Sequence, residues 1–349
     1  MQPVHQIVGW DADAIACWER VAPTSADDPQ ARIALLSPTI PGRRELIVSW
    51  AAETPAGSWI ELQVRVGQAD QWGRWFRLAA WDSALSNSRR SSFADQRGPD
   101  GHVATDTLML TSAPELVQAR VLLCAEPGAD MPELEALTIC ASDGTPAVDP
   151  GAAALPASTV PLPVLRSQYS YAEGTGWCSP TAVTMVLAAW YAQTGDPRLA
   201  ALAEPDAIPT LAAPLIHDPA WEGTGNWAFN VAFAASRGLT AYVTRFERLE
   251  QLACWTATGV PVIVSLAWQA GEITDAPGAT NGHLTIVRGF AGDRVLIAEP
   301  ASPDEASVLR AYPADQFFAA WQRTSAGTVY LIYPPAWSRP EPGANDAWI

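Results

Sequence analysis

The chain has 349 residues, which is longer than one typical globular core and predicts two domains. Hydrophobic residues make up 48% and charged residues 17%, a composition that excludes a disordered chain. The net charge is −16, and so acidic a surface repels nucleic acid and anionic membranes. No segment reaches the roughly 20 apolar residues that cross a bilayer, so we expect no transmembrane segment.

The N-terminal segment has no basic stretch followed by an apolar one, which argues against a signal peptide. We therefore expect a cytoplasmic protein as written, with export open if a leader has been removed.

The five cysteines are odd in number and irregularly spaced, which predicts neither a disulfide framework nor a zinc site, and no cofactor is expected. Four of them are expected to be small buried hydrophobic residues: Cys17, Cys124, Cys140 and Cys254.

Short strands with turn-rich connections fill residues 45 to 140. In one of them Ile60, Leu62, Val64 and Val66 alternate with Glu61, Gln63 and Arg65. The predicted strands are 45–50, 59–66, 74–81, 106–111, 116–124 and 134–140. Repeated period-two strands without a helical period predict an antiparallel β-sandwich, which we place in residues 1–150.

Five tryptophans in this half have two interpretations. They either fill the core between two sheets, which we favour, or form an exposed face that contacts sugar rings. The second interpretation would give residues 1–150 a role in cell-wall, glycan or other substrate targeting. These residues are Trp50, Trp59, Trp72, Trp75 and Trp81.

Residues 151–163 are rich in Ala and Pro without any period, which is typical of a linker. Residues 164–340 then mix helical and extended patterns, so the complete chain is predicted to be α+β. Helices are expected at 180–193, 227–237, 247–258 and 315–323, and strands at 260–268, 283–290, 294–300 and 327–333.

Cys178 follows a glycine-rich turn and a tryptophan, directly before the first of these helices. The positive end of a helix dipole and its free N–H groups favour a thiolate, so this position activates a sulfur. Packing of Cys178 as a small residue is an equally open interpretation. A thiolate nucleophile also needs a base.

His283 is the best candidate for that base among four histidines. It opens an apolar strand, where it is either a core histidine or the partner of the cysteine. His5 and His217 are expected on the surface, and His102 in a loop of the sandwich. A hairpin at 291–293 would bring Glu299 to the neighbouring strand, where its carboxylate can fix the imidazole tautomer. Otherwise Glu299 is a solvated strand end.

Acyl transfer also needs donors for the developing oxyanion. The backbone N–H of Cys178 is one candidate donor, and the side-chain amide of Gln168 is a second. Together these residues describe a cysteine hydrolase, in which Trp177 and Trp227 either line the cleft or lie in the core. The open alternatives are an acyltransferase that uses the same thiol, and a non-catalytic binding protein.

Three segments resemble the family 39 cysteine peptidases, which include bacteriocin-processing peptidases that cut after double-glycine leaders. They are PLPVLRSQ, WCSPTAVTMVL and NGHLTIVRGFAGDRVLIAEPAS. The resemblance spans roughly residues 160 to 333 and implies a papain-like fold in residues 164–340, with a peptide or protein substrate. It also implies Cys178 as nucleophile, His283 as base, Glu299 as its orienting carboxylate and Gln168 in the oxyanion hole. The family usually has Asp where Glu299 stands.

Overall fold

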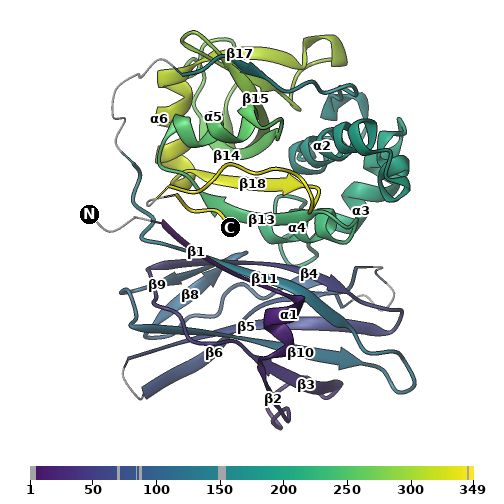
Figure 1. Ribbon diagram of the computed structural model, residues 1–349, viewed down its shortest axis with the longest axis vertical. Coiled ribbons are helices and arrows are strands. Elements are labelled where there is room, and N and C mark those ends of the chain that lie inside the picture. The colour runs from purple at the N-terminus through teal and green to yellow at the C-terminus, as the bar shows by residue number, and fades with distance from the viewer. Residues whose placement is uncertain (1–4, 69–70, 84, 86–88, 148–154, 344–345) are drawn as a thin grey trace.

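The computed structural model describes residues 5–68, 71–83, 85, 89–147, 155–343 and 346–349 (Figure 1). Figure 1 shows two layers of strands at one end of the molecule, with helices and a third sheet at the other. The predicted α+β class, with an antiparallel sandwich before the mixed half, is confirmed.

Two antiparallel sheets form the sandwich. The first has the order β1-β11-β4-β9-β8 and the second the order β2-β3-β10-β5-β6-β7. Five strands make the first sheet: β1 (His5–Asp11), β11 (Glu133–Ser142), β4 (Glu45–Glu53), β9 (Thr107–Leu110) and β8 (Gly101–Ala104). Six strands make the second: β2 (Glu19–Val21), β3 (Ala31–Leu36), β10 (Leu116–Ala125), β5 (Ser58–Gln68), β6 (Gln71–Trp81) and β7 (Ser91–Ser92). A short helix, α1 (Ala12–Ala16), follows β1.

All six strands predicted between 45 and 140 are present, and Trp50 and Trp81 are buried in the main core as predicted. Trp59 is buried instead in a separate small cluster, and Trp72 and Trp75 are half-buried beneath Arg65, so the prediction that they fill the core between the sheets is wrong. The three strands before residue 45, which are β1, β2 and β3, were not predicted. His5 was expected at the surface, but it is buried in β1 with Nδ1 2.9 Å from the Ser142 hydroxyl. Cys17 and Cys254 are exposed, so the expectation that they are buried is wrong.

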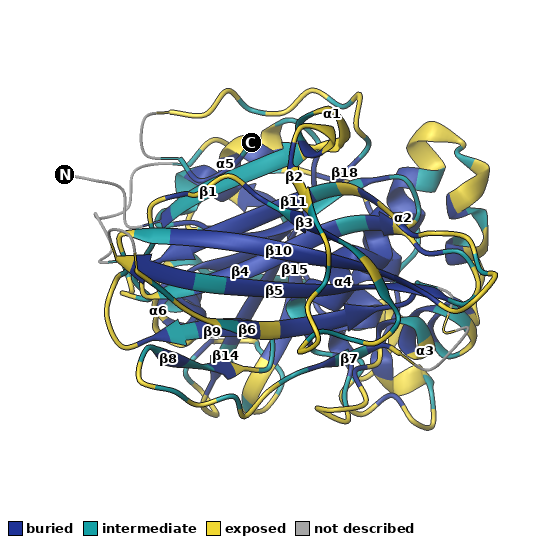
Figure 2. Cartoon of the chain, turned by 90° about the horizontal axis from the view of Figure 1, so that it is seen from below, coloured by how far each residue is buried: buried dark blue, intermediate teal, exposed yellow. Residues whose placement is uncertain are grey.

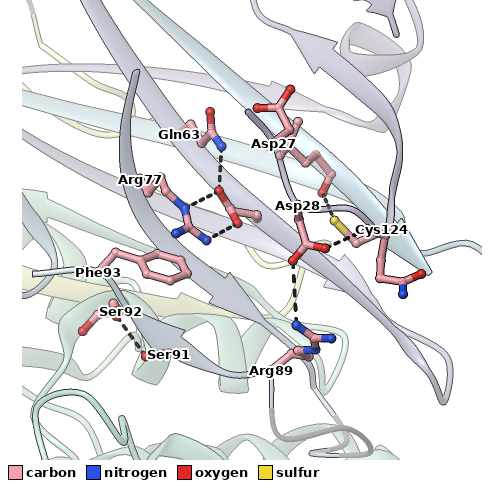
Figure 3. Close-up of polar contacts among 12 residues, drawn as sticks. Asp27, Asp28, Gln63, Arg77, Arg89, Ser91, Ser92, Phe93 and Cys124 are labelled. Atoms are coloured by element: carbon pink, nitrogen blue, oxygen red, sulfur yellow. Dashed lines mark hydrogen bonds and ion pairs between the residues drawn. The ribbon is translucent and has the colours of Figure 1, made fainter. Parts of the chain in front are cut away.

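The outer face of the second sheet is covered rather than solvated (Figure 3). Glu61 is 1% exposed and accepts two hydrogen bonds of 2.7 Å from Arg77. The Phe93 ring covers that guanidinium with its centroid at 3.8 Å. The central strands β5 and β10 of this sheet are therefore buried on both faces, as Figure 2 shows. Alternation alone does not reveal such a covered face.

The second half of the chain packs its helices around one large antiparallel sheet with the order β13-β18-β14-β15-β16-β17, where β12 also pairs with β15. Its strands are β12 (Ser158–Thr159), β13 (Thr240–Arg245), β14 (Val262–Trp268), β15 (Thr280–Ala291), β16 (Arg294–Ala298), β17 (Leu309–Pro313) and β18 (Thr328–Tyr333). Its α-helices are α2 (Cys178–Thr194), α3 (Ala213–Ile216), α4 (Trp227–Ala235), α5 (Leu249–Ala257) and α6 (Ala314–Ser325). Four shorter helical segments are η1 (Gln168–Ser170), η2 (Pro197–Ala203), η3 (Ile208–Ala212) and η4 (Glu305–Ser307).

Helix α2 lies at the centre of this half, and its residues from Cys178 to Trp190 are all buried. A helix that is apolar on every side is typical of such a position. It ends at Gly195, whose φ of 67° is the left-handed conformation that favours glycine. The helix begins two residues earlier than predicted, so Cys178 lies in its first turn.

Part of the predicted linker, residues 151–154, lies outside the described residues. The following residues are built into the third sheet, because β12 pairs with β15 and the Val160 N–H donates to the Arg288 carbonyl at 2.6 Å. The division into two domains stays a prediction. Among the described residues no single helix is long and apolar enough to cross a membrane, although the bent pair 197–203 and 208–216 passes that test when combined.

Helix α4 joins the two halves by packing against β4 of the sandwich and β13 of the third sheet (Figure 1). Its Phe229 ring meets Trp81 edge-on at 5.2 Å and Trp50 at 6.1 Å, measured between centroids. The Ser49 hydroxyl also accepts the Val243 N–H at 2.9 Å. The hydrophobic core therefore runs without a break from the sandwich into the second half.

We expect Phe229→Ala to lower the free energy of unfolding by about 3–5 kcal/mol, because it leaves a cavity between two buried tryptophans. Urea unfolding followed by tryptophan fluorescence measures this change. Tyr169→Ala is the control, since its ring is 52% exposed and its loss should cost less than about 0.5 kcal/mol. Equal costs for the two variants would contradict the assigned packing.

Candidate active site

A glycine-rich loop immediately precedes Cys178, the first residue of α2. Gly174 packs so closely that a Cβ there would lie 1.7 Å from the Gln168 carbonyl oxygen, and Gly176 has a φ of 89°. The Trp177 N–H donates to the Gly174 carbonyl at 2.9 Å, which closes the turn immediately before the cysteine. Cys178 is 9% exposed and lines a cleft of about 690 Å³.

His283 lies on β15 opposite Leu266 of β14, and its side chain lines the same cleft. Its Nε2 is hydrogen-bonded to Oε1 of Glu299, and the Cys178 sulfur lies close enough to the ring to act on its charge. Because Nε2 is engaged by the carboxylate, Nδ1 is the nitrogen left for the sulfur. The imidazole therefore lies within reach of both a thiol and a carboxylate.

The β15–β16 hairpin explains how Glu299 reaches the imidazole. Ile286 pairs with Ala298 in the antiparallel register, so Glu299 follows the last residue of β16 and lies diagonally across from His283. Its carboxylate is fully buried and also accepts the Ala301 N–H at 2.8 Å and the Tyr312 hydroxyl at 3.0 Å. Three donors thus hold one buried carboxylate in a fixed orientation.

The electrostatics of the pair favour the charged form of both partners. Burial disfavours the imidazolium, but the Glu299 carboxylate and the Cys178 sulfur outweigh it and raise the pKa of His283 to about 10. Burial also acts to raise the pKa of Glu299, and the charge and hydrogen bond of His283, with the other two donors, lower it below its usual range.

Sequence reasoning missed two aromatic residues around this pair. The Trp268 ring stands perpendicular to the His283 ring at 5.2 Å between centroids and is 2% exposed, so it keeps water from the imidazole. Tyr312 lies on β17, a short strand that was not predicted. The sequence held a signal for Trp268, because this residue ends the predicted strand 260–268. That strand pairs with the strand that carries His283.

Gln168 is the first residue of η1. It lies next to both the loop that precedes Cys178 and the loop that follows Glu299. Its backbone N–H donates to the Pro300 carbonyl at 2.8 Å, next to Glu299, and its carbonyl lies under Gly174 in the loop before Cys178. The side chain is 5% exposed, and its Oε1 has no hydrogen-bond partner among the described residues. Gln168 is not among the described residues that line the cleft.

The two predicted substrate-binding tryptophans have different surroundings. Trp227 is half-buried at the start of α4 and lines the cleft. Trp177 is not among the described lining residues, and its ring packs near Tyr171 with centroids 6.2 Å apart. A third residue, Trp221, lines the cleft and is 49% exposed. It lies in a loop of no regular period, which offered no sequence signal.

The remaining histidines and cysteines lie apart from this site. His217 is exposed at the end of α3, and His102 lies on β8 rather than in a loop. Cys124 and Cys140 are buried in the sandwich. No group of metal-ligating side chains is found among the described residues.

A buried Cys–His–carboxylate arrangement, with the cysteine on a central helix and the histidine on an antiparallel sheet, is typical of a cysteine peptidase. Comparison with known families gives the same class. Residues 34–142 match the peptidase C39 N-terminal domain, and residues 162–329 match the peptidase C39-like family. The chain therefore carries a C39-like peptidase domain after a C39 N-terminal domain.

Two solved structures resemble the chain. One is a double glycine motif protease from an AMS/PCAT transporter in complex with its leader peptide, at 16% identity and a TM-score of 0.31. The other is a C39-like peptidase from Bacillus anthracis, at 14% identity and a TM-score of 0.33. Each match covers 53% of this chain and 99% of the other. No curated protein matches the chain.

The His283–Glu299 pair predicts a specific pH dependence of stability. The pKa of His283 is about 10 in the folded protein and ordinarily 6.5, so folding binds a proton between these values. The stabilisation by His283 is complete below pH 6.5 and is lost as pH rises to about 10, at no more than about 1.4 kcal/mol per pH unit. The contribution of Glu299 is lost instead at acid pH.

Urea unfolding of the natural protein and of His283→Gln at pH 6, 8 and 10 measures this effect. We expect the difference in free energy of unfolding between them to shrink as pH rises. A difference that is independent of pH across this range would contradict a charged, paired His283.

Proposed function

We propose that this protein is a cysteine peptidase that cleaves peptide or amide bonds through Cys178, His283 and Glu299. The observation that carries the proposal is the imidazole of His283, which is hydrogen-bonded to the Glu299 carboxylate and lines an open cleft together with Cys178, whose sulfur acts on its charge. The match of residues 162–329 to the C39-like peptidase family supports it.

In the proposed reaction the Cys178 sulfur, as a thiolate, attacks the carbonyl carbon of the scissile bond. The S–C bond forms, and the carbonyl π electrons move onto oxygen. When the tetrahedral intermediate collapses, the C–N bond breaks and the His283 imidazolium gives its proton to the leaving amine. The neutral imidazole then takes a proton from water, whose oxygen attacks the thioester and releases the Cys178 sulfur.

The fixed groups around the pair fit these roles. Glu299 holds Nε2, which directs Nδ1 towards the sulfur and balances the positive charge of the imidazolium. The first N–H groups of α2 have no partner within the helix, so the Cys178 N–H is available to the oxyanion. The Gln168 amide is the proposed second donor, since the backbone of this buried residue contacts both the loop before Cys178 and Pro300 next to Glu299.

We expect selective alkylation of Cys178 by iodoacetamide at pH 6, read by mass spectrometry. Its rate should exceed those of the exposed Cys17 and Cys254 by at least about tenfold, because the neighbouring imidazolium favours a thiolate. His283→Ala should remove this advantage while circular dichroism stays unchanged.

Cys178→Ala should abolish cleavage of a random peptide library without unfolding the chain, whereas Cys254→Ala should leave cleavage intact. Persistent cleavage by Cys178→Ala would refute the assignment of the nucleophile. Slow, unselective labelling together with no cleavage by the natural protein would instead favour a non-catalytic binding protein.

A further inference from the structure

The cleft beside Cys178 is built by both halves of the chain. Ala104, Thr105, Asp106 and Thr107, which form the β8–β9 turn of the sandwich, line it together with Cys178 and His283. Thr105 holds a φ of 55°, an unusual value for a β-branched residue, so the turn has a defined shape. The sandwich therefore supplies a wall of the proposed substrate site.

A chain of hydrogen bonds links this turn to the cysteine loop. The Asp106 carboxylate accepts the Trp227 N–H at 2.6 Å, at the first residue of α4. The loop before α4 is fastened in turn to the cysteine loop, since the Thr224 hydroxyl donates to the Gly176 carbonyl at 3.0 Å. Asp106 and Trp227 are thus held at a fixed place relative to the thiol.

Asp106 differs from the other charged residues that line the cleft, because each of those forms an ion pair. Arg245 pairs with Glu45, Arg323 with Glu272, and His283 with Glu299. Asp106 accepts hydrogen bonds from the Trp227 N–H and the Thr107 hydroxyl, and it has no ion pair with any described residue. A carboxylate in a cleft without a counter-ion is a partner for a cationic group.

Two aromatic rings complete this corner of the cleft. Trp227 lines the cleft and its backbone N–H is bonded to the Asp106 carboxylate, and Trp221 lies over two glycines of the loop before α4. A Cβ added to Gly225 would approach the Trp221 ring to 2.6 Å, and one added to Gly223 would approach it to 2.8 Å. The two glycines therefore make room for an exposed indole that faces the cleft. Indole faces attract alkylammonium and guanidinium groups.

We propose that Asp106, Trp221 and Trp227 form a subsite that binds a basic side chain of the peptide substrate, so that the N-terminal sandwich determines specificity. This proposal rests on the proposed peptidase function. The net charge of −16 also attracts cationic peptides to the protein.

Ionisation of Asp106 gives the preference a pH dependence. Burial raises the pKa of Asp106 to about 6, the Trp227 and Thr107 hydrogen bonds act against this rise, and the charge of Asp218 adds to it. Asp218, in the loop before α4, carries the like charge that acts on Asp106, and it is itself held by the Asn226 amide at 2.9 Å. Tyr330 of β18 is a second titratable group within electrostatic reach of Asp106, and burial raises the pKa of its hydroxyl well above the ordinary value. The preference for a basic side chain should therefore be weak at pH 5 and full at pH 7.5.

The test measures binding without requiring catalysis. Acetyl-Ala-Ala-X-Ala-Ala-amide, with X as lysine, norleucine or glutamate, is titrated into the Cys178→Ala protein by calorimetry at pH 5 and 7.5. We expect the lysine peptide to bind at least about tenfold more tightly than the norleucine peptide at pH 7.5, and the glutamate peptide to bind weakest.

The decisive variant is Asp106→Asn, since asparagine keeps an acceptor for the Trp227 N–H but removes the charge. It should bring the ratio of lysine to norleucine affinity close to one. Asp11→Asn is the matched control, because Asp11 likewise accepts a helix N–H, at 2.9 Å from Ala14, but lies outside the cleft lining. It should leave the ratio unchanged.

Equal affinities for lysine and norleucine peptides, a preference that survives Asp106→Asn, or no binding of either peptide at millimolar concentration would each overturn the subsite. These outcomes are separate from failure of the peptidase proposal, which is judged by alkylation and cleavage in the natural protein. A reactive Cys178 with no preference for lysine refutes the subsite alone.

Discussion

The packing of helix α4 between the sandwich and the third sheet is the interaction on which the rest of the structure depends. Its Phe229 fills the space against Trp81 and Trp50, so the two halves share one core. The N-terminal end of the same helix carries Trp227 to the cleft. Because Phe229 lies in the first turn of this helix, its burial fixes the position of Trp227 in the cleft wall.

The His283–Glu299 pair shows which interactions stabilise a buried ion pair. Taking two charges out of water is costly, and their mutual attraction compensates only when the remaining hydrogen-bonding capacity is used. Here Ala301 and Tyr312 supply the further donors to the carboxylate, and Trp268 covers the ring. Glutamate suits this position because it follows the end of β16 and must reach diagonally to the imidazole.

The shared cleft changes the interpretation of the sandwich. A sandwich attached through a mobile linker would act as a separate targeting module. In this structure the five-stranded sheet is instead fastened to the second half, by the Ser49–Val243 hydrogen bond and by Glu45 with Arg245. Its β8–β9 turn lines the cleft next to the thiol. Trp50 and Trp81 consequently serve the shared core rather than a sugar-binding face.

The sequence by itself determined the local elements and the residues of the candidate site. Periodicity located six strands of the sandwich, helix α2 and the β15–β16 hairpin, because these patterns reflect interactions between residues close in the chain. The hairpin in turn related His283 to Glu299 over a separation of 16 residues.

Only the tertiary structure decided what covers each face and what completes the cleft. The burial of Glu61, the placement of Trp268 over His283 and the approach of Asp106 to Trp227 all join segments distant in sequence, and Asp106 and Trp227 are 121 residues apart. No local pattern encodes such contacts. They arise from the way complete sheets and helices pack against one another.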